Sequence, residues 1–540
     1  MSLRATNLDR LDGGSFDVLI IGGGINGAVS AAALASGGAK VAVVDRGDFA
    51  GFTSMQSSNL VWGGFKYLEN YEIGLVRHLC MSRNHLLKSY PANLKEIRFL
   101  ATLDQHSPYP AWFAGMGALG YWLIGNGATK PPRALTRRQI KRADAAIDVS
   151  HARGGIEYSD AYIVDNDSRF TFGFVRSALN VGATCANYVE VTHAERRDGW
   201  WEASLRDTDS GAEYSARARV LINAGGPFAD ELNREHGITT RHRVVLSKGV
   251  HLIVPRIARS ERVLAFFDDT QRLFYVIPMG LRSVIGTTDE RVDSPHTEVT
   301  PEDVEFLLGQ INARLTLSTP LTVEDVISTR CGVRPLVVEA TGPSVDAVDW
   351  TALSRKHAIE SDAGKGHITI FGGKLTDCLN IGAEVCREAA RLGVGLERDR
   401  HNWYGEPPAA TRDEFFRQAK YMGLDRMRHH ASFETLSTRL WRRYGLRAFA
   451  MLESIRDDPS MADDVVEDTE YVRAELFLSA RTEMITKLDD FLRRRSKIAL
   501  VRRHEDIRHA KGLDEACELL FGADAQRRHA EYFGDSDGSR

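Results

Sequence analysis

The sequence lacks the marks of several protein classes. Its six cysteines are scattered among 540 residues without a Cys-x-x-Cys pair or zinc-ligand spacing, which predicts buried free thiols, a reducing compartment and no metal site. The net charge of −4 argues against a general nucleic-acid-binding protein. The first ten residues, MSLRATNLDR, lack the apolar core of a secretory signal, so we expect a cytoplasmic protein.

The chain nevertheless has ample material for a large core. Hydrophobic residues make up 43% of it and charged residues 26%, as in soluble globular proteins, and 540 residues allow two or three domains. Alternating apolar and polar positions over residues 241–300 predict an antiparallel sheet. Helical spacing of apolar residues from about 405 to 520 predicts a separate helical domain. We expect residues 1–15 to be a flexible lead-in and 526–540 a disordered tail.

Residues 16–49 carry the strongest single motif. An apolar strand leads into the pattern G-x-G-x-x-G at Gly22, Gly24 and Gly27, an Ala-rich helix follows, and a second strand ends at Asp45. The glycines permit the tight turn and a close approach to a pyrophosphate, and the helix N-terminus favours phosphate. Asp45 is placed to accept hydrogen bonds from an adenosine ribose. This combination predicts dinucleotide binding but does not separate FAD from a nicotinamide cofactor.

Three further stretches are candidates to line the same site. Residues 51–64, GFTSMQSSNLVWGG, offer Thr53, Ser54, Ser57 and Ser58 either to the cofactor or as caps of the next helix. A strand at 220–227 ends in Ala-Gly-Gly-Pro, a small-residue turn that suits closure over a dinucleotide. Gly372 and Gly373 precede a predicted helix, whose N-terminus then faces whatever lies there.

The most apolar run is AWFAGMGALGYWLIG, residues 111–125. It is shorter than the roughly 20 residues that span a bilayer. The basic residues that follow it at 133–142 fit a helix lying in a membrane interface. From the residues alone, a buried helix followed by a solvated basic helix is the favoured alternative.

Five segments, in order along the chain, point to one family. They are NLVWGGFKYLENYEIGLV (59–76), SKGVHLIVPR (247–256), SVIGTTDE (283–290), CGVRPL (331–336) and IFGGKLTDC (370–378). Together they resemble the FAD-dependent glycerol-3-phosphate dehydrogenases, and the likeness covers roughly residues 16 to 500.

The resemblance implies an α/β fold with three parts. These are a Rossmann-like FAD-binding domain of the glutathione-reductase and amino-acid-oxidase type, an antiparallel-sheet substrate domain and a C-terminal helical domain. The oxidoreductase region would span 16–400, with FAD-binding parts near 16–80, 150–235 and 325–400 and the substrate-side sheet mainly in 81–149 and 236–324; the helical domain would span 405–525. Implied FAD-binding residues are Gly22, Gly24, Gly27, Asp45, Thr53, Ser54, Ser57, Ser58, Val189, Gly225, Lys374 and Thr376.

The resemblance also implies the reaction, in which sn-glycerol 3-phosphate is oxidised at C2 with hydride transfer to flavin N5. The reduced flavin would be reoxidised by membrane quinone, or by oxygen in some members. Arg334 and Lys374 would stabilise the developing alkoxide and the reduced flavin. His251 would accept the hydroxyl proton. The residues that would bind the phosphate are Lys66, Tyr67 and Arg355, with Thr287, Thr288 and Asp289 lining the same region or forming a structural strand end.

Two departures from the family pattern bear on the substrate. Trp62 and Lys66 stand where the family usually has histidine and arginine, so the bidentate fork that suits phosphate is lost. Two alternatives therefore remain: a different phosphorylated polyol, such as erythritol phosphate, as the substrate, or an oxidase that uses oxygen as the acceptor. The cationic residues implied by the resemblance argue against two other hypotheses, an amine oxidase and a non-enzymatic protein. Family members are peripheral membrane proteins and often dimers, so the resemblance favours membrane association, on the inner face of the cell membrane.

Overall fold

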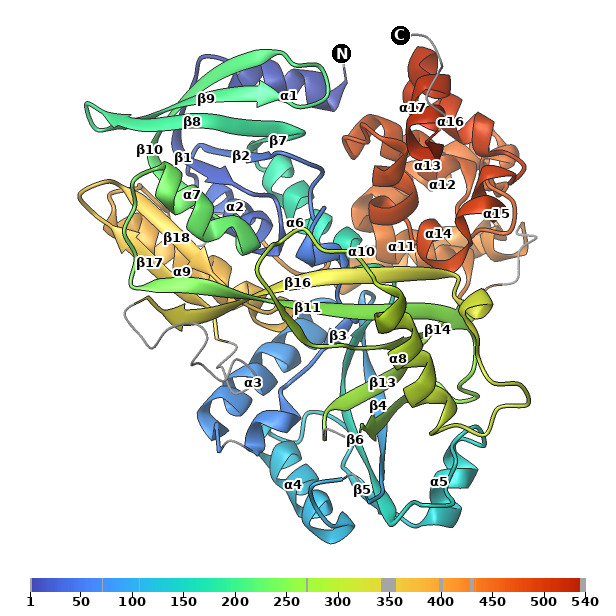
Figure 1. Cartoon of the computed structure of the whole chain (residues 1–540). Helices are drawn as coiled ribbons and strands as arrows, with labels where there is room; N and C mark the ends of the chain where they lie inside the picture. Colours follow the sequence, from blue (N-terminus) through green and yellow to red (C-terminus); the bar gives the residue numbers. More distant parts are fainter. Residues whose placement is uncertain are drawn as a thin grey trace. The chain divides into compact units, whose positions relative to one another are not determined.

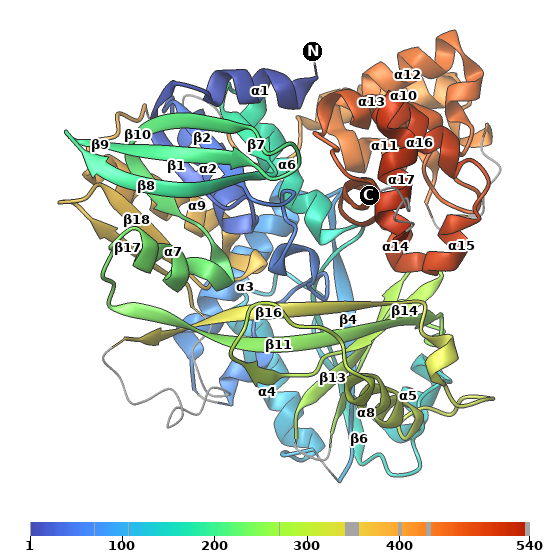
Figure 2. The same ribbon diagram turned by 45° about the horizontal axis from the view of Figure 1, so that its top comes forward.

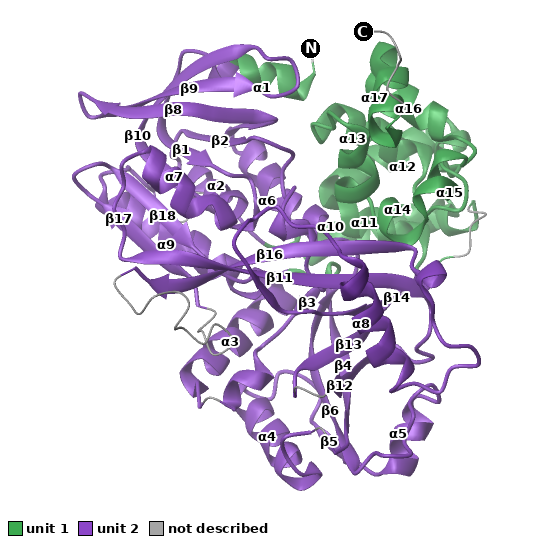
Figure 3. Ribbon diagram, in the orientation of Figure 1, with its two compact units in different colours: residues 1–9, 90–93, 405–540 green, residues 10–89, 94–404 purple. Residues whose placement is uncertain are grey.

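The computed structural model describes residues 2–69, 71–105, 107–268, 271–340, 356–397, 402–427, 432 and 434–534. The chain divides into two compact units (Figure 3). The larger unit comprises residues 10–89 and 94–404, and the smaller unit comprises residues 1–9, 90–93 and 405–540. Two β-sheets build the larger unit, whereas the smaller unit is helical.

The first sheet is mainly parallel and carries the glycine-rich turn. Its strands lie in the order β17 (Ala358–Asp362), β18 (His367–Phe371), β10 (Glu213–Asn223), β1 (Gly14–Ile21), β2 (Val41–Asp45) and β7 (Thr184–Asn187), and β8 (Val189–Arg197) and β9 (Trp200–Asp207) form a hairpin paired to β10. The central strands are buried on both faces, so their sequences are continuous apolar runs.

An Ala-rich helix follows the turn. In α2 (Ile25–Ser36) every residue after the first is buried. Its small side chains allow close packing against two further helices, α6 (Asp167–Asn180) and α9 (Cys378–Arg391), on one face of the sheet (Figure 1). The short helix α7 (Ala229–Glu235) follows β10.

The second sheet is mainly antiparallel. Its strands lie in the order β15 (Glu290–Val292), β11 (His242–Pro255), β14 (Arg282–Gly286), β13 (Leu273–Met279), β12 (Val263–Phe267), β4 (Leu94–Leu103), β6 (Gly154–Ile163) and β3 (Leu60–Val61), with β16 (Ser328–Glu339) paired to β11 and β5 (Arg133–Leu135) to β6. The long strands β11 and β16 of this sheet pair along most of their length and lie side by side in Figure 2. The mixed α/β fold predicted from the sequence is confirmed.

Four helices accompany the second sheet. They are α3 (Ile73–Ser89), α4 (Ala111–Ile124), α5 (Arg137–Ala143) and α8 (Pro301–Asn312). Thr300 caps α8, whose Leu307 and Ile311 pack on the apolar core of the sheet. Both α3 and α4 contact β6 and each other. In the described part of the chain, no helix has the length and apolarity needed to cross a bilayer.

The smaller unit contains helices around two apolar clusters. These helices are α10 (Ala409–Tyr421), α11 (Leu436–Tyr444), α12 (Ala448–Asp457), α13 (Arg473–Thr482), a π-helix (Asp490–Arg495), α14 (Ile498–Val501), α15 (His504–Arg508), α16 (Leu513–Phe521) and α17 (Ala525–Phe533). Phe415 and Trp441 anchor one cluster, and Tyr471 and Phe491 the other.

The structure corrects three expectations. The N-terminus is not a flexible lead-in, because Leu8 and Leu11 are buried on helix α1 (Leu3–Leu11). Residues 526–533 are not a disordered tail, because α17 buries Phe533 in the second cluster; residues 535–540 lie outside the described part. Strands β6 and β16, expected in the FAD-binding parts, belong to the second sheet, since they pair with β4 and β11.

Candidate active site

A cleft of about 310 Å³ lies at the carboxyl end of the first sheet. Most of the predicted cofactor residues line it: Gly22, Gly24, Asp45, Thr53, Ser54, Ser57, Val189 and Gly225. They come from the ends of β1, β2, β8 and β10 and from the loop after β2. Ligands of open α/β sheets bind at this edge, so the predicted dinucleotide site is assembled as one cleft.

The glycines of the turn are required by their surroundings. Gly22 has a φ of +104°, and a Cβ there would lie 2.6 Å from the carbonyl oxygen of Ala224. A Cβ at Gly27 would lie 1.8 Å from the carbonyl oxygen of Gly22. Gly27 therefore does not line the cleft but lets α2 pack against the turn.

Asp45 and Ser54 organise the turn as well as lining the cleft. The Asp45 carboxylate accepts the N–H of Gly23 at 2.7 Å and that of Gly47 at 2.9 Å. Burial raises the pKa of this carboxyl, and the two N–H donors oppose that effect. Ser54 Oγ accepts the N–H of Ile25 at 2.9 Å, so a residue offered as a phosphate ligand also caps α2.

Sequence reasoning missed an aromatic and cationic group at this cleft. The guanidinium of Arg46 lies 4.0 Å from the ring centroid of Phe228, and the rings of Phe52 and Phe228 meet edge to face at 4.9 Å. These side chains fit a planar base or ribose at the edge of the cleft. Their contact joins segments 176 residues or more apart, and no local pattern marks it.

A second cavity, of about 730 Å³, adjoins the cleft. The two share five lining residues: Thr53, Ser57, Pro335, Gly373 and Leu375. The second cavity is also lined by most of the predicted reaction residues, namely Lys66, Tyr67, Thr287, Asp289, Arg334 and Lys374, and by two predicted cofactor residues, Ser58 and Thr376. A dinucleotide in the cleft can thus extend its reactive ring toward a substrate held among cations.

Arg334 is held firmly within the cavity wall. Its Nη2 donates to Thr287 Oγ1 at 3.0 Å, and its Nη1 lies 3.2 Å from Asp289 Oδ1. The guanidinium also covers Gly249, where a Cβ would lie 2.1 Å from Nη2. Thr288 faces elsewhere, since its hydroxyl accepts the N–H of Val250. A cation fixed in this way can stabilise negative charge without reorganising.

Lys374 and Tyr67 meet in the lining of the same cavity. Lys374 Nζ donates to the Tyr67 hydroxyl and lies 4.2 Å from the centroid of that ring and 5.5 Å from the ring of Trp62. The Thr376 hydroxyl donates to the Trp62 carbonyl at 3.3 Å. Lys66 also lines the cavity; it is the second residue of the 3₁₀ turn at Phe65–Leu68.

His251 differs from the other predicted residues. Its side chain on β11 is buried, packs against Gly286 and is not among the residues that line the cavity. Burial, and then the cations of Arg334 and Arg330, lower its pKa to about 3. The imidazole is therefore neutral near pH 7. Arg355 lies outside the described residues.

The lowered pKa of His251 predicts an acid-sensitive contribution to stability. The unfolded chain protonates this imidazole near pH 6.5, but the folded protein only near pH 3, so the free energy of unfolding falls as the pH drops from about 6.5. His251→Gln should lessen the stability lost between pH 7.5 and 5 by about 2 kcal/mol, measured by denaturant unfolding. The exposed His193→Gln is the control, and an equal slope in both variants would contradict the expectation.

Comparison with known proteins covers nearly the whole chain. The sequence model described as FAD dependent oxidoreductase matches residues 17–376, and that of the C-terminal domain of alpha-glycerophosphate oxidase matches residues 413–528. The chain is 31% identical to glycerol-3-phosphate dehydrogenase 2 of Mycobacterium tuberculosis, over 98% of this chain and 89% of the relative. It is 29% identical to the aerobic glycerol-3-phosphate dehydrogenase of Escherichia coli, over 89% and 93%.

A solved structure shares the fold. The glycerol-3-phosphate dehydrogenase from Bacillus halodurans, complexed with FAD, matches 99% of this chain and 96% of its own with a TM-score of 0.73 and 21% identity. The α/β architecture and the helical C-terminal part are thus found together in a known protein.

Proposed function

The chain belongs to the FAD-dependent glycerol-3-phosphate dehydrogenase family, and from this membership we propose that it oxidises sn-glycerol 3-phosphate to dihydroxyacetone phosphate. FAD is the cofactor, and when bound it supplies the hydride acceptor, N5, for the hydrogen on C2. The observation that supports the proposal best is that the cavity adjoining the dinucleotide cleft is lined by five cationic side chains, those of Lys66, Arg272, Arg334, Lys356 and Lys374.

The chain's own residues fit FAD. A close-packed glycine turn, the Asp45 carboxylate and the small residues after β10 offer room for a pyrophosphate and an acceptor for a ribose. Asn26 Oδ1, buried at the same cleft, has no hydrogen-bond partner among the described residues. Lys374 and Thr376 extend the binding surface into the second cavity.

On the substrate side, Lys66 and Tyr67 bind the phosphate, and Arg355 joins them by family resemblance. Arg334 and Lys374 stabilise the oxygen on C2 as it becomes an alkoxide, because fixed cations favour the developing charge. By family resemblance, His251 accepts the hydroxyl proton; its imidazole is neutral near pH 7, although burial keeps its basicity low.

Anaerobic bleaching of the flavin tests the function. Purified holoenzyme is mixed with sn-glycerol 3-phosphate, erythritol 4-phosphate, glycerol or several amino acids, and the visible absorption is followed. We expect rapid bleaching by glycerol 3-phosphate and little by glycerol, since the cations bind the phosphate. Faster bleaching by erythritol 4-phosphate than by glycerol 3-phosphate would identify erythritol 4-phosphate as the preferred substrate. Bleaching by an amino acid alone would overturn the proposal.

The electron acceptor we propose is a membrane quinone. An apolar cavity of about 250 Å³ lies beneath α4, lined by Phe65, Phe113 and Tyr158 among others. It shares Glu69 and Leu273 with the reaction cavity, so a planar apolar acceptor there would lie beside the redox centre.

That the protein forms a homodimer stays a prediction from the family resemblance.

The helix α4 supports peripheral association with the inner face of the cell membrane. Only Ala118 and Tyr121 of α4 are buried, and its exposed side chains are large and apolar: Trp112, Phe113, Met116, Leu119 and Leu123. Exposed cations follow at Lys130, Arg133, Arg137, Arg138 and Arg142. An apolar helix face beside a basic segment fits the interface of an anionic bilayer.

Charged substitutions on that face test the association. Leu119→Glu with Leu123→Glu should abolish most co-sedimentation with vesicles containing anionic lipid, because carboxylates cannot enter the acyl boundary. Leu446→Glu, at an exposed leucine of the smaller unit, is the matched control and should sediment as the unmodified protein does. Equal sedimentation of all three proteins would refute the role of α4.

A further inference from the structure

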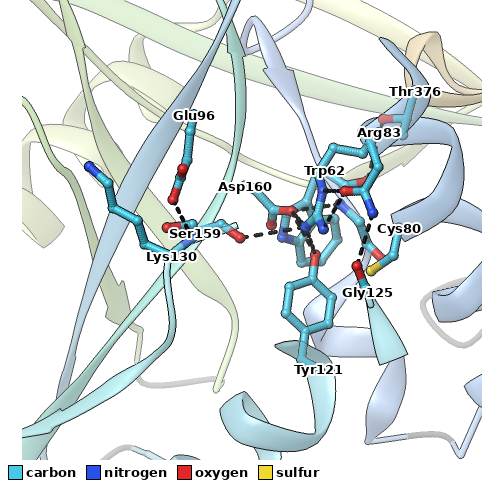
Figure 4. Close-up of polar contacts among 12 residues, drawn as sticks. Trp62, Cys80, Arg83, Glu96, Tyr121, Gly125, Lys130, Ser159, Asp160 and Thr376 are labelled. Atoms are coloured by element: carbon cyan, nitrogen blue, oxygen red, sulfur yellow. Dashed lines mark hydrogen bonds and ion pairs between the residues drawn. The ribbon is translucent and has the colours of Figure 1, made fainter. Parts of the chain in front are cut away.

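A buried ion pair lies behind the wall of the reaction cavity (Figure 4). The Asp160 carboxylate of β6 is fully buried, and Arg83 Nη1 of α3 lies 2.5 Å from its Oδ1; the Arg83 side chain is 2% exposed. The hydroxyl of Tyr121, the buried tyrosine of α4, donates to the same oxygen at 2.6 Å. Neither charge lines the cavity, so neither contacts the substrate.

The third donor to Asp160 connects this cluster to the cavity. The N–H of Gly63 donates to Oδ1 at 3.1 Å. The carbonyl of the same peptide, that of Trp62, accepts the Thr376 hydroxyl at 3.3 Å, and the next carbonyl, that of Gly63, lies 3.8 Å from the Cys80 thiol. Both peptide groups that flank Gly63 are therefore held by side chains from other elements.

Tyr121 packs so closely against Gly63 that it restricts the backbone there. A Cβ at Gly63 would lie 2.2 Å from the Tyr121 hydroxyl oxygen. Gly64 follows with a φ of +85°, and the turn at Phe65–Leu68 then carries Lys66 and Tyr67 into the cavity. A shift of the peptide at Gly63 would thus move the two residues proposed to bind the phosphate.

Stability alone does not account for this cluster. Taking two charges out of water costs more than a buried ion pair usually returns, and apolar replacements of similar size are often neutral or stabilising. A connected network of buried hydrogen bonds does, however, hold its residues rigidly in one conformation. The network includes the backbone N–H of Gly63, which follows Trp62 of the cavity lining.

We propose that Asp160, Arg83 and Tyr121 are positioning residues that hold the turn from Trp62 to Tyr67 where Lys66 and Tyr67 bind the phosphate of the substrate. The inference rests on the proposed function of that site. The cluster should affect how tightly the substrate binds, because the phosphate is bound away from the reacting C2. Loosening the cluster should raise KM, whereas kcat should change little.

Two variants test it. Tyr121→Phe removes one donor and leaves the ring. The triple variant Arg83→Met, Tyr121→Phe, Asp160→Leu removes the whole cluster without leaving a buried charge unpaired. The matched control is Tyr471→Phe in the smaller unit, where another buried tyrosine hydroxyl accepts a backbone N–H, that of Lys497.

For each holoenzyme, KM, kcat, flavin content and Tm are measured. Inorganic phosphate is also titrated while the visible flavin spectrum is followed. We expect KM and the phosphate Kd to rise about tenfold in the triple variant and several-fold in Tyr121→Phe, with kcat within about threefold and flavin retained. Lys66→Ala should shift both constants in the same direction. Tyr471→Phe should lower Tm and leave both constants unchanged.

Unchanged KM and phosphate affinity in the flavin-loaded triple variant would overturn the proposal. If that variant does not fold, a lower Tm with unchanged KM in Tyr121→Phe would overturn it equally. Should glycerol 3-phosphate fail to bleach the unmodified enzyme, the proposed function fails. The phosphate titration then still decides the inference: weaker phosphate binding in the variants supports it, and equal binding refutes it.

Discussion

Replacing Arg334 with alanine lowers kcat by about 10²–10³-fold while FAD stays bound, the loss typical of removing one preorganised donor to a developing oxyanion. Arg334 is expected to stabilise the alkoxide forming at C2, and its guanidinium is already fixed by Thr287 and Asp289. Because that stabilisation exists mainly in the transition state, KM should change much less than kcat. Steady-state kinetics on glycerol 3-phosphate, with flavin content measured by absorbance, checks this result.

The exposed Arg77→Ala is a suitable control, since Arg77 lies on α3 and does not line the cavity. Its kcat should match that of the unmodified enzyme. Near-normal turnover in Arg334→Ala would show that the cation acts elsewhere. Loss of FAD in that variant would assign Arg334 to cofactor binding instead.

Gly27→Ala yields protein that no longer retains FAD. The new Cβ would lie 1.8 Å from the carbonyl oxygen of Gly22, a backbone atom that can move only by displacing the turn itself. The start of α2 would be pushed from β1, and the N–H groups that face the pyrophosphate would be lost with it. The flavin-to-protein absorbance ratio after gel filtration measures the effect, and we expect at least a tenfold loss.

Gly173→Ala provides the matched control, because Gly173 also lies within a helix of the larger unit and a Cβ there meets nothing within 4 Å. Alanine favours the helix more than glycine by about 1 kcal/mol, so this variant should keep FAD and melt no lower than the unmodified protein. Full FAD retention in Gly27→Ala would mean that the turn adjusts without losing its ligand geometry.

These two predictions rest on different amounts of sequence information. The positions of Gly22, Gly27 and Asp45 could be inferred from spacing alone, because the strand, turn and helix they join are contiguous in the chain. Arg334 and Lys374 were placed by family resemblance, and both line one cavity. Their roles in the reaction stay predictions.

Other features depend on contacts between distant segments. His251 lies on β11, which is buried over a continuous stretch, so alternation of polar and apolar residues could not tell which way its ring faces. Arg46 and Phe228 meet only through the fold. The same holds for Arg83, Tyr121 and Asp160, each of which alone resembles an ordinary residue of its own helix or strand.

The buried thiols have a consequence for the enzyme's chemical durability. A reduced flavin that meets oxygen releases peroxide, which attacks thiolates rather than thiols. Burial raises the pKa of Cys80 to about 11 and that of Cys185 and Cys517 to about 12, so these sulfurs stay protonated near pH 7. The Cys80 thiol lies 3.8 Å from the carbonyl oxygen of Gly63, next to Trp62 of the cavity lining. Slow oxidation of these three thiols is therefore expected when the reduced flavin meets oxygen.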